Sequence, residues 1–368
     1  MYSGCRTLQF LFLLATGIYT HYGWADSCGG SVGQMTINVQ NIKYLPTLQA
    51  NTQMTSAMAD NGGGIHFVCD LLLPTASMKR IIYKQRNTAG SPRMINGQHV
   101  YDSGLSGMGY SLGFQCEGGA IRYIDGGSAP AGGESMTVCD SAQMSTLLAR
   151  RETVVKAYIT FYKTGDIPLV SGNHTSVAAQ PQVGNLYIEK QDRGSASRTL
   201  SSPVSIDLSA LNVDIGANGS CQVTRSSIGV NLGTVNKAEF KGKTTVAGAA
   251  QTFSIPVFCS TPADIRIGFF GVTADPGIGD ALALAQVVGA ASGVGIKLSY
   301  GNNSAPAPSA GTPIKINEAS NLPVLKHITA SSAATAENIN FSARYVQTGD
   351  RVTPGRANGL ATFALEYN

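Results

Sequence analysis

Residues 106–114 have the sequence SGMGYSLGF, and residues 292–300 have the related sequence SGVGIKLSY. A second related pair follows these in the same order, AYITFYKTGD at 157–166 and FSARYVQTGD at 341–350. A single match of this length can arise by chance, but two matches in one order are evidence for an internal repeat. The repeat predicts that one strand plan is used twice in this chain.

Cysteines support the repeat. Cys28 and Cys69 precede the first copy, and Cys221 and Cys259 precede the second copy at similar spacing. Each half therefore has a cysteine pair, an SGxG strand, a TGD turn and a glycine-led alternating strand, in that order. The expected division of the chain is a first domain, a short linker and a second domain, at residues 26–215, 216–220 and 221–368.

Composition favours an all-β fold. Charged residues are only 13% of the chain, and 43 glycines are spread along it. Short runs of alternating apolar and polar residues lie between the turn residues, for example at 154–162, 184–190 and 361–367. Such a pattern is typical of sandwiches, and only 141–152 suggests a turn or two of helix. We expect two immunoglobulin-like β-sandwich domains in tandem, because two such domains suit the length of the chain.

The N-terminus has the features of a secretory signal peptide. Arg6 is the only charged residue in the first 25, an apolar run covers 8–18, and Gly23 and Ala25 are small residues before a possible cleavage site. The apolar run is short for a transmembrane helix, although an uncleaved N-terminal anchor is the alternative. We expect residues 1–25 to be removed on export. Loss of Arg6 lowers the formal net charge from +4 to +3, which is too weak a bias to favour nucleic acid as a partner.

Six of the seven cysteines remain after residue 25. An even count in an exported chain predicts three disulfides, although six cysteines allow 15 pairings. No CxxC spacing is present, so neither a metal nor another cofactor is expected. The repeated cysteine pair favours one pairing, namely Cys28–Cys69, Cys116–Cys139 and Cys221–Cys259.

The two halves differ at their ends. After the strand at 184–190 the first half continues through VSIDLSALNV at 204–213, whereas the second half stops at Asn368 just after its matching strand. A sandwich without its last strand exposes core side chains and unpaired backbone groups. We therefore expect the second domain to accept a strand from another chain. Side-chain alternation places four residues on the face that this strand would complete: Ala361, Phe363, Leu365 and Tyr367. The alternative is an ordinary amphipathic edge strand.

The C-terminal residues resemble those of pilus subunits from the chaperone–usher pathway. The resemblance rests on the penultimate Tyr367, on Gly355 at fourteenth from the end, and on GTV at 233–235 after Cys221. The first half, notably VYDSGLSGMGYSLGF at 100–114, is similar to receptor-binding domains of the two-domain tip adhesins of type 1 and type 3 pili.

This resemblance implies a fimbrial tip adhesin at the bacterial surface. Its implied partners are a periplasmic chaperone, an outer-membrane usher, the next pilus subunit as strand donor, and a host glycan or matrix receptor. The chaperone would pair with 361–367 and hold the Asn368 carboxylate. The alternative is a structural minor pilin or assembly initiator that binds no host ligand. An enzyme is not expected, because the histidines after residue 25 are scattered without a catalytic pattern: His66, His99, His174 and His327.

Ligand-binding residues are predicted by position in this family. The pocket of the mannose-specific adhesins is built from the N-terminus, the loop after the second cysteine and the loop before the last strand of the first domain. The corresponding residues here are Asp26, Asp70, Gln191, Asp192 and Arg193. The pattern then departs from the family, because three leucines follow at 71–73, so mannose itself is doubtful. The alternatives are a strand-end carboxylate for Asp70 and a solvated turn for 191–193.

The segment between Cys116 and Cys139 is an addition to the repeat plan. Long stapled loops often carry recognition residues, and the side chains best suited to contact here are Arg122, Tyr123 and Asp125. The alternative is a plain hairpin that staples a small domain.

Overall fold

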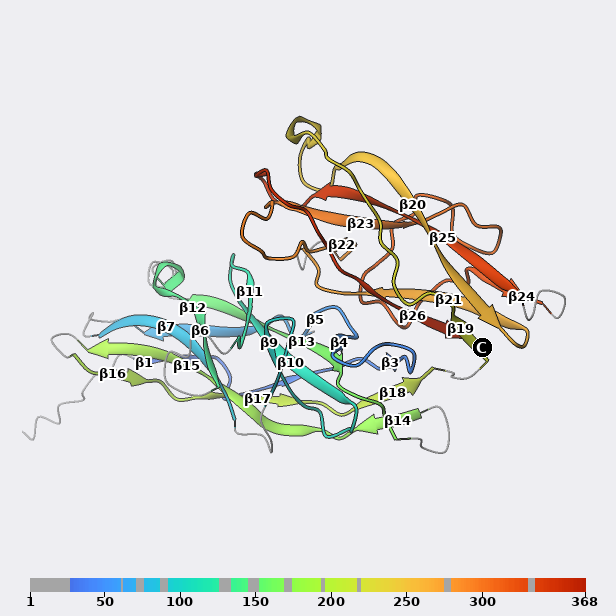
Figure 1. Cartoon of the computed structure of the whole chain (residues 1–368). Helices are drawn as coiled ribbons and strands as arrows, with labels where there is room; N and C mark the ends of the chain where they lie inside the picture. The colour runs from blue at the N-terminus through green and yellow to red at the C-terminus, as the bar shows by residue number, and fades with distance from the viewer. Residues whose placement is uncertain are drawn as a thin grey trace, which may run out of the picture.

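The computed structural model of the chain describes residues 27–60, 62–70, 76–86, 92–125, 134–144, 152–168, 174–192, 196–216, 220–274, 279–329 and 335–368. The expected signal peptide at 1–25 lies outside this part, as do Asp26 and Arg193. The protein is nearly all-β (Figure 1). Residues 141–144 are helical, within the stretch where the sequence suggested a turn or two of helix, and η1 (Lys237–Glu239) is a short 3-10 turn.

The described residues of the first half build three sheets. One has the order β1-β6-β13-β10-β9-β8 with β4, β5 and β11 at its sides: β1 (Ser27–Gly30), β6 (Ile65–Asp70), β13 (Glu152–Lys163), β10 (Met108–Cys116), β9 (Gln98–Asp102), β8 (Arg93–Ile95), β4 (Thr52–Gln53), β5 (Met58–Ala59) and β11 (Ile121–Tyr123). The second has the order β12-β7-β15-β17-β2 with β16 beside β15: β12 (Ser135–Cys139), β7 (Ala76–Gln85), β15 (Gln180–Asp192), β17 (Val204–Leu208), β2 (Gln34–Ile37) and β16 (Arg198–Leu200). The third joins β14 (His174–Val177), β18 (Leu211–Ile215) and β3 (Ile42–Tyr44).

In the second half, the residues that the structure describes build two sheets. The larger has the order β19-β20-β25-β23-β22: β19 (Cys221–Val223), β20 (Val246–Cys259), β25 (Ala336–Gln347), β23 (Val294–Tyr300) and β22 (Ala281–Leu282). The smaller has the order β24-β21-β26: β24 (Lys326–Ile328), β21 (Ala263–Phe270) and β26 (Thr362–Tyr367). In the described part of the chain, no sheet takes strands from both sides of 216–220.

The repeat in the sequence is also a repeat of backbone geometry. Met108 of β10 pairs with Lys163 of β13, and Val294 of β23 pairs with Gln347 of β25, at matching positions of the two copies. The glycine before each strand has a positive φ, 87° at Gly107 and 69° at Gly293. Each of these glycine carbonyls accepts the backbone N–H groups of the threonine and glycine in the TGD turn. The SGxG and TGD sequences therefore form one local structure, in which glycine supplies a conformation that other residues rarely adopt.

The strand orders of the two halves correspond up to one point. The run β1-β6-β13-β10-β9 matches β19-β20-β25-β23-β22, and the run β12-β7-β15 matches β24-β21-β26. In the first half β17 then pairs with the other edge of β15, and β2 follows β17. In the described second half no strand follows β26. The last strand of the chain thus lacks one of the two neighbours that its counterpart has.

Each half has its own apolar core, because alternating side chains of facing sheets point inward. Buried aromatic residues mark the first core, among them Phe67, Tyr83, Tyr110, Phe114 and Phe161. The second core contains Phe269, Phe341, Leu365 and Tyr367. Four residues of the second half pack on the first core instead, so the two halves are in contact: Phe270, Ala319, Leu322 and Ala364.

Two of the three expected disulfides are present. One joins Cys116 to Cys139 and the other joins Cys221 to Cys259. The backbone register of β1 and β6 places Cys28 opposite Cys69. The side chains of these two cysteines lie outside the described residues, so this third disulfide stays a prediction.

Candidate functional site

The last strand, β26, contacts both halves of the protein. Alternate side chains face the second core, as the sequence pattern predicted: Ala361, Phe363, Leu365 and Tyr367. The opposite face of β26 is covered by the first half. There Ala364 joins the first core, and the buried Glu366 forms an ion pair with Lys43 of β3. A strand whose two faces are buried leaves only its edges available to a partner.

One edge of β26 is open, since no other described strand pairs with it. Its other edge is paired with β21, and Asp264 donates its backbone N–H to the Asn368 carbonyl at the end of that ladder. In an antiparallel pair the backbone groups of alternate residues point to opposite edges. The N–H and C=O groups of Phe363, Leu365 and Tyr367 therefore point away from β21. One of these carbonyls, that of Leu365, accepts a hydrogen bond of 2.6 Å from the Thr47 hydroxyl.

The segment 226–232 faces this open edge. Ile228, Val230 and Leu232 are partly buried against the second core, and they alternate with exposed residues as in a strand. In the described part of the chain, the backbone groups of 226–232 form no hydrogen bond with other backbone groups. This segment follows β19 as β2 follows β1, so it occupies the place of β2 in the second half. The vacant place between it and β26 corresponds to that of β17.

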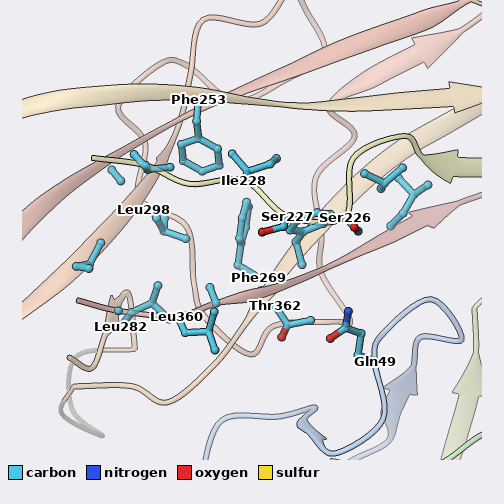
Figure 2. Close-up of a pocket in the computed structure, with 18 of the residues that line it drawn as sticks. Gln49, Ser226, Ser227, Ile228, Phe253, Phe269, Leu282, Leu298, Leu360 and Thr362 are labelled. Atoms are coloured by element: carbon cyan, nitrogen blue, oxygen red, sulfur yellow. The ribbon is translucent and has the colours of Figure 1, made fainter. Parts of the chain in front are cut away.

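The vacant place is a groove with a volume of about 610 Å³. Its walls are 226–232 on one side and 359–363 with Leu365 on the other. Phe253, Phe269 and Leu298 are among the apolar residues that line it, and Figure 2 shows these side chains pointing into the pocket. The lining offers apolar pockets beside unpaired backbone groups, which is the chemistry that an extended peptide strand can satisfy. Among the described residues, no cluster of histidine, cysteine or carboxylate side chains could hold a metal ion.

Asn368 already has partners within the chain. Its side-chain oxygen accepts a hydrogen bond of 3.0 Å from Arg266, and its carbonyl accepts one of 3.2 Å from the Asp264 amide. These contacts fix the end of β26 against β21. The expected contact of the Asn368 carboxylate with a chaperone's basic residues stays a prediction.

The predicted ligand residues of the first half belong to strand ends that meet. Ser27 at the start of β1 pairs with Asp70 at the end of β6. The end of β15 pairs with the start of β7, where Gln191 is opposite Ser77. Figure 1 shows β1, β16 and this end of β15 at the side of the molecule away from β26. The backbone thus brings 27, 70 and 191–192 to the same end of the first half, while the side chains of Asp70 and Asp192 lie outside the described residues.

A charged cluster lies next to this end. Glu189 of β15 is buried, and it forms ion pairs with Arg80 of β7 and with Arg198 of β16. No local pattern marks this cluster, because Arg80 is 109 positions from Glu189 and only Arg198 is close to it, at a separation of nine. The cluster holds β7, β15 and β16 together just before Gln191.

The predicted residues of the 116–139 segment are largely occupied by internal contacts. β11 pairs with β10, and Arg122 forms an ion pair of 2.8 Å with Asp140 and a hydrogen bond to the Thr137 carbonyl. The Arg122 guanidinium lowers the pKa of the Asp140 carboxyl. Burial raises the pKa of Tyr123, whose ring lies over Gly113. Asp125 is exposed. These contacts agree with a stapled hairpin.

The first half also supplies groove residues that no sequence pattern predicted. Thr47 and Gln49 lie in the turn after β3 and line the groove beside Thr362. Figure 2 shows Gln49 on a separate ribbon at the edge of the pocket, near Thr362. No local pattern marks these two residues, because their role depends on contact with a strand more than 300 residues later, as the separation of 318 between Thr47 and Leu365 shows.

Comparison with known proteins places the open strand within a known domain. Residues 210–368 match the model of the family described as fimbrial protein. This region carries a fimbrial protein domain. The fimbrial region includes the whole groove except for Thr47 and Gln49. In the described residues, no helix is long and apolar enough to span a membrane.

Curated relatives of the chain are fimbrial adhesins. The F17c-G fimbrial adhesin of Escherichia coli is 23% identical over 177 residues, which are 47% of this chain and 49% of that protein. The F17a-G fimbrial adhesin of the same organism is 23% identical over 177 residues, with coverage of 47% and 48%. The chain thus spans about half the length of the curated relatives that it matches.

Solved structures with similarity to the chain include fimbrial adhesins. The Proteus mirabilis ambient temperature fimbriae adhesin AtfE has 15% identity and a TM-score of 0.35, covering 50% of this chain and 99% of its own. The CupB6 tip adhesin of Pseudomonas aeruginosa has 17% identity and a TM-score of 0.28, covering 92% of this chain and 94% of its own.

Proposed function

We propose that this protein is a fimbrial tip adhesin whose second half is completed by a strand from another subunit. The single observation that supports this most is the difference between β15 and β26. Strand β15 has β7 on one edge and β17 on the other, whereas among the described strands β26 pairs only with β21. Unpaired edges and exposed core residues are costly, so a partner strand should fill the groove.

The partners follow from this proposal. A periplasmic chaperone first supplies the missing strand, an outer-membrane usher receives the complex, and the N-terminal extension of the next subunit then replaces the chaperone strand. Since residues 26–215 form the other half, the chain caps the pilus tip and presents that half as a receptor-binding domain. The F17-G relatives, which are fimbrial adhesins by name, support the adhesin part.

The strand proposal is tested by expressing the two halves separately in an oxidising compartment. Residues 26–215 should fold alone and melt cooperatively. Residues 221–368 should not, unless a turn and a copy of VSIDLSA from 204–210 are added after Asn368, so that the added strand folds back beside β26. A version with the same residues in scrambled order is the matched control. A monomeric and cooperatively melting 221–368 without any added strand would contradict the proposal.

Receptor binding is tested with residues 26–215 on a glycan array and on matrix proteins. We propose that the receptor contacts the end of the first half that contains Asp26, Asp70 and residues 191–193. Replacing Gln191, Asp192 and Arg193 with Ala should abolish attachment and leave piliation intact. Changing Arg122, Tyr123 and Asp125 is the matched control; if only this change abolishes attachment, the site lies in the hairpin. Binding by neither domain nor pilus would favour a structural minor pilin.

A further inference from the structure

The turn that follows β3 is held rigidly by the first half. Leu45 and Leu48 are 1% and 2% exposed, so both are anchored in the first core. The buried Lys163 donates a hydrogen bond of 2.7 Å to the Pro46 carbonyl, and the Lys163 carbonyl accepts one of 2.7 Å from the Asn51 amide. We call residues 45–51 the anchored turn. Its position is therefore set by the first half alone.

The anchored turn contacts the open edge of β26. The Thr47 hydroxyl donates to the Leu365 carbonyl at 2.6 Å, so this acceptor on the open edge is already occupied. Lys43, just before the turn, forms the ion pair with the buried Glu366. Thr47 and Gln49 both line the groove, Thr47 at Leu365 and Gln49 beside Thr362. The groove is thus bounded by the first half near Leu365.

The other end of the groove continues further. A second hollow of about 440 Å³ is lined by 233–235, Phe240, Tyr345 and 352–357. Leu232 of the groove wall is followed directly by Gly233 of this hollow. The strand-accepting surface is therefore long in the direction of 352–357 and blocked in the direction of Leu365.

The first half shows how a filled edge is arranged at the same place. Ile188 of β15 is opposite Ile81 of β7, as Leu365 of β26 is opposite Ile267 of β21. Strand β17 runs antiparallel to β15 and its pairing begins with Val204 opposite Leu186, one alternate position before Ile188. The Ile188 carbonyl accepts instead from the Ser201 amide at 2.9 Å, outside β17.

The backbone carbonyls of Leu365 and Ile188 also correspond as hydrogen-bond acceptors. The Leu365 carbonyl takes a donor from the anchored turn, as the Ile188 carbonyl takes one from Ser201. By the same correspondence, Phe363 takes the place of Leu186, where β17 begins. A strand placed like β17 would therefore start its pairing at Phe363.

We propose that Thr47 and Gln49 form a stop that sets the end of the accepted strand. The incoming strand pairs antiparallel with β26, its N-terminal end abuts the anchored turn at Phe363, and its C-terminal part continues toward 352–357. The partner is an extended peptide with alternating apolar residues. At its N-terminal end, at most one residue precedes the first side chain that is buried in the groove. This inference rests on the proposed function, and it assigns the choice of register to the first half of the same chain.

Synthetic peptides test the stop. The core peptide is VSIDLSA, the sequence of 204–210, and two longer peptides add Val-Thr before it or Thr-Val after it, so that each adds one inward valine. The full chain is unfolded in guanidinium with its disulfides intact, refolded with each peptide, and the Kd is measured. Burial of one more valine should lower the Kd about tenfold. The C-terminal extension should show this gain, and the N-terminal extension should leave the Kd within about twofold.

Variants of the anchored turn identify the residues. In a chain with Thr47→Ala and Gln49→Ala, the N-terminal extension should also gain about tenfold. Thr47→Ser, which keeps the hydroxyl, should behave as the native chain. A photoreactive residue at the N-terminal end of the core peptide should label 45–51 in the native chain, and this measurement does not depend on folding of a variant.

The outcomes separate the two proposals. The stop is wrong, while strand acceptance stands, if the N-terminal extension raises the affinity tenfold in the native chain or fails to raise it in the double variant. The same conclusion follows if the photoreactive peptide labels only 352–357. If none of the peptides binds, the strand-accepting function itself fails and the stop fails with it.

Discussion

Replacement of Tyr367 separates ring packing from hydroxyl chemistry at the end of β26. The side chain is 4% exposed, and its hydroxyl is buried without a hydrogen-bond partner among the described residues. Tyr367→Ser removes a buried ring, and loss of a buried aromatic ring costs about 3–5 kcal/mol. Tyr367→Phe removes only the unpartnered hydroxyl, so the free energy of unfolding should stay the same or rise by about 1 kcal/mol. Domains have total stabilities of about 5–15 kcal/mol, and one that lacks a strand should be near the lower limit.

The assay measures full-length protein in the periplasm of cells that also make the chaperone. Tyr367→Ser should leave little full-length protein and a protease-resistant first half that retains its ligand binding, whereas Tyr367→Phe should accumulate at native levels. A one-residue extension after Asn368 should also lower the amount, because it disturbs the end of the ladder with β21. Equal loss for Ser and Phe would show that the hydroxyl has an essential partner. Normal delivery of Tyr367→Ser to the pilus tip would refute the role of this strand in capture.

Three other predictions concern stability. Gly293→Ala places a methyl group in a left-handed conformation, at φ 69°, and should lower the free energy of unfolding by about 1–3 kcal/mol in urea titrations; an unchanged midpoint would contradict the role of the SGxG turn. The Cys221–Cys259 disulfide closes a loop with a sequence separation of 38. Its reduction should lower the free energy of unfolding by about 4 kcal/mol in the chain-entropy model. The measurement is the melting temperature of the full chain with a peptide bound in its groove, which should fall. Arg122 lowers the pKa of the Asp140 carboxyl, so the ion pair stabilises the first half at pH values above the unfolded-state pKa of Asp140. This contribution is lost as the pH falls through the lowered folded-state pKa. Asp140→Asn should therefore reduce the melting temperature at neutral pH and have no effect at strongly acidic pH, and an equal loss at both pH values would exclude the ion pair as the cause.

Local sequence patterns predicted much of the fold. Alternation placed Phe363, Leu365 and Tyr367 on one face of a strand, and all three contact the second core. The SGxG and TGD repeats predicted a shared plan, and the glycine carbonyls at 107 and 293 accept the same hydrogen bonds. These features depend on residues close in sequence or on a period of two, which a single sequence contains.

Contacts between the two halves could not be predicted in this way. Glu366 alternates with apolar residues, so the pattern predicts that its side chain is exposed to solvent. In the structure the side chain is buried and forms an ion pair with Lys43. Thr47 is an ordinary turn residue until the Leu365 carbonyl is placed beside it. Such contacts arise only once two folded surfaces meet, and nothing in the local sequence of either residue signals them.

The structure gives positions for some of the predicted ligand residues. Arg122 was expected to be available for contact, whereas it is paired with Asp140, because a guanidinium at the base of a stapled hairpin can reach a carboxylate just beyond the second cysteine. The meeting of 70 and 191 at one end of the first half follows from strand order. Which of these residues contacts a receptor stays a prediction.

The hydrogen bond between Thr47 and Leu365 also has a consequence for the order of events during biosynthesis. The two residues are 318 positions apart, so at roughly 5–20 residues per second Thr47 is made about 16–64 s before Leu365. Small domains fold well within this interval. If the exported chain folds in the order of its synthesis, the anchored turn should be complete when the last strand becomes available, and β26 should dock onto it. The turn at 45–51 would then act as an internal folding aid for the last strand.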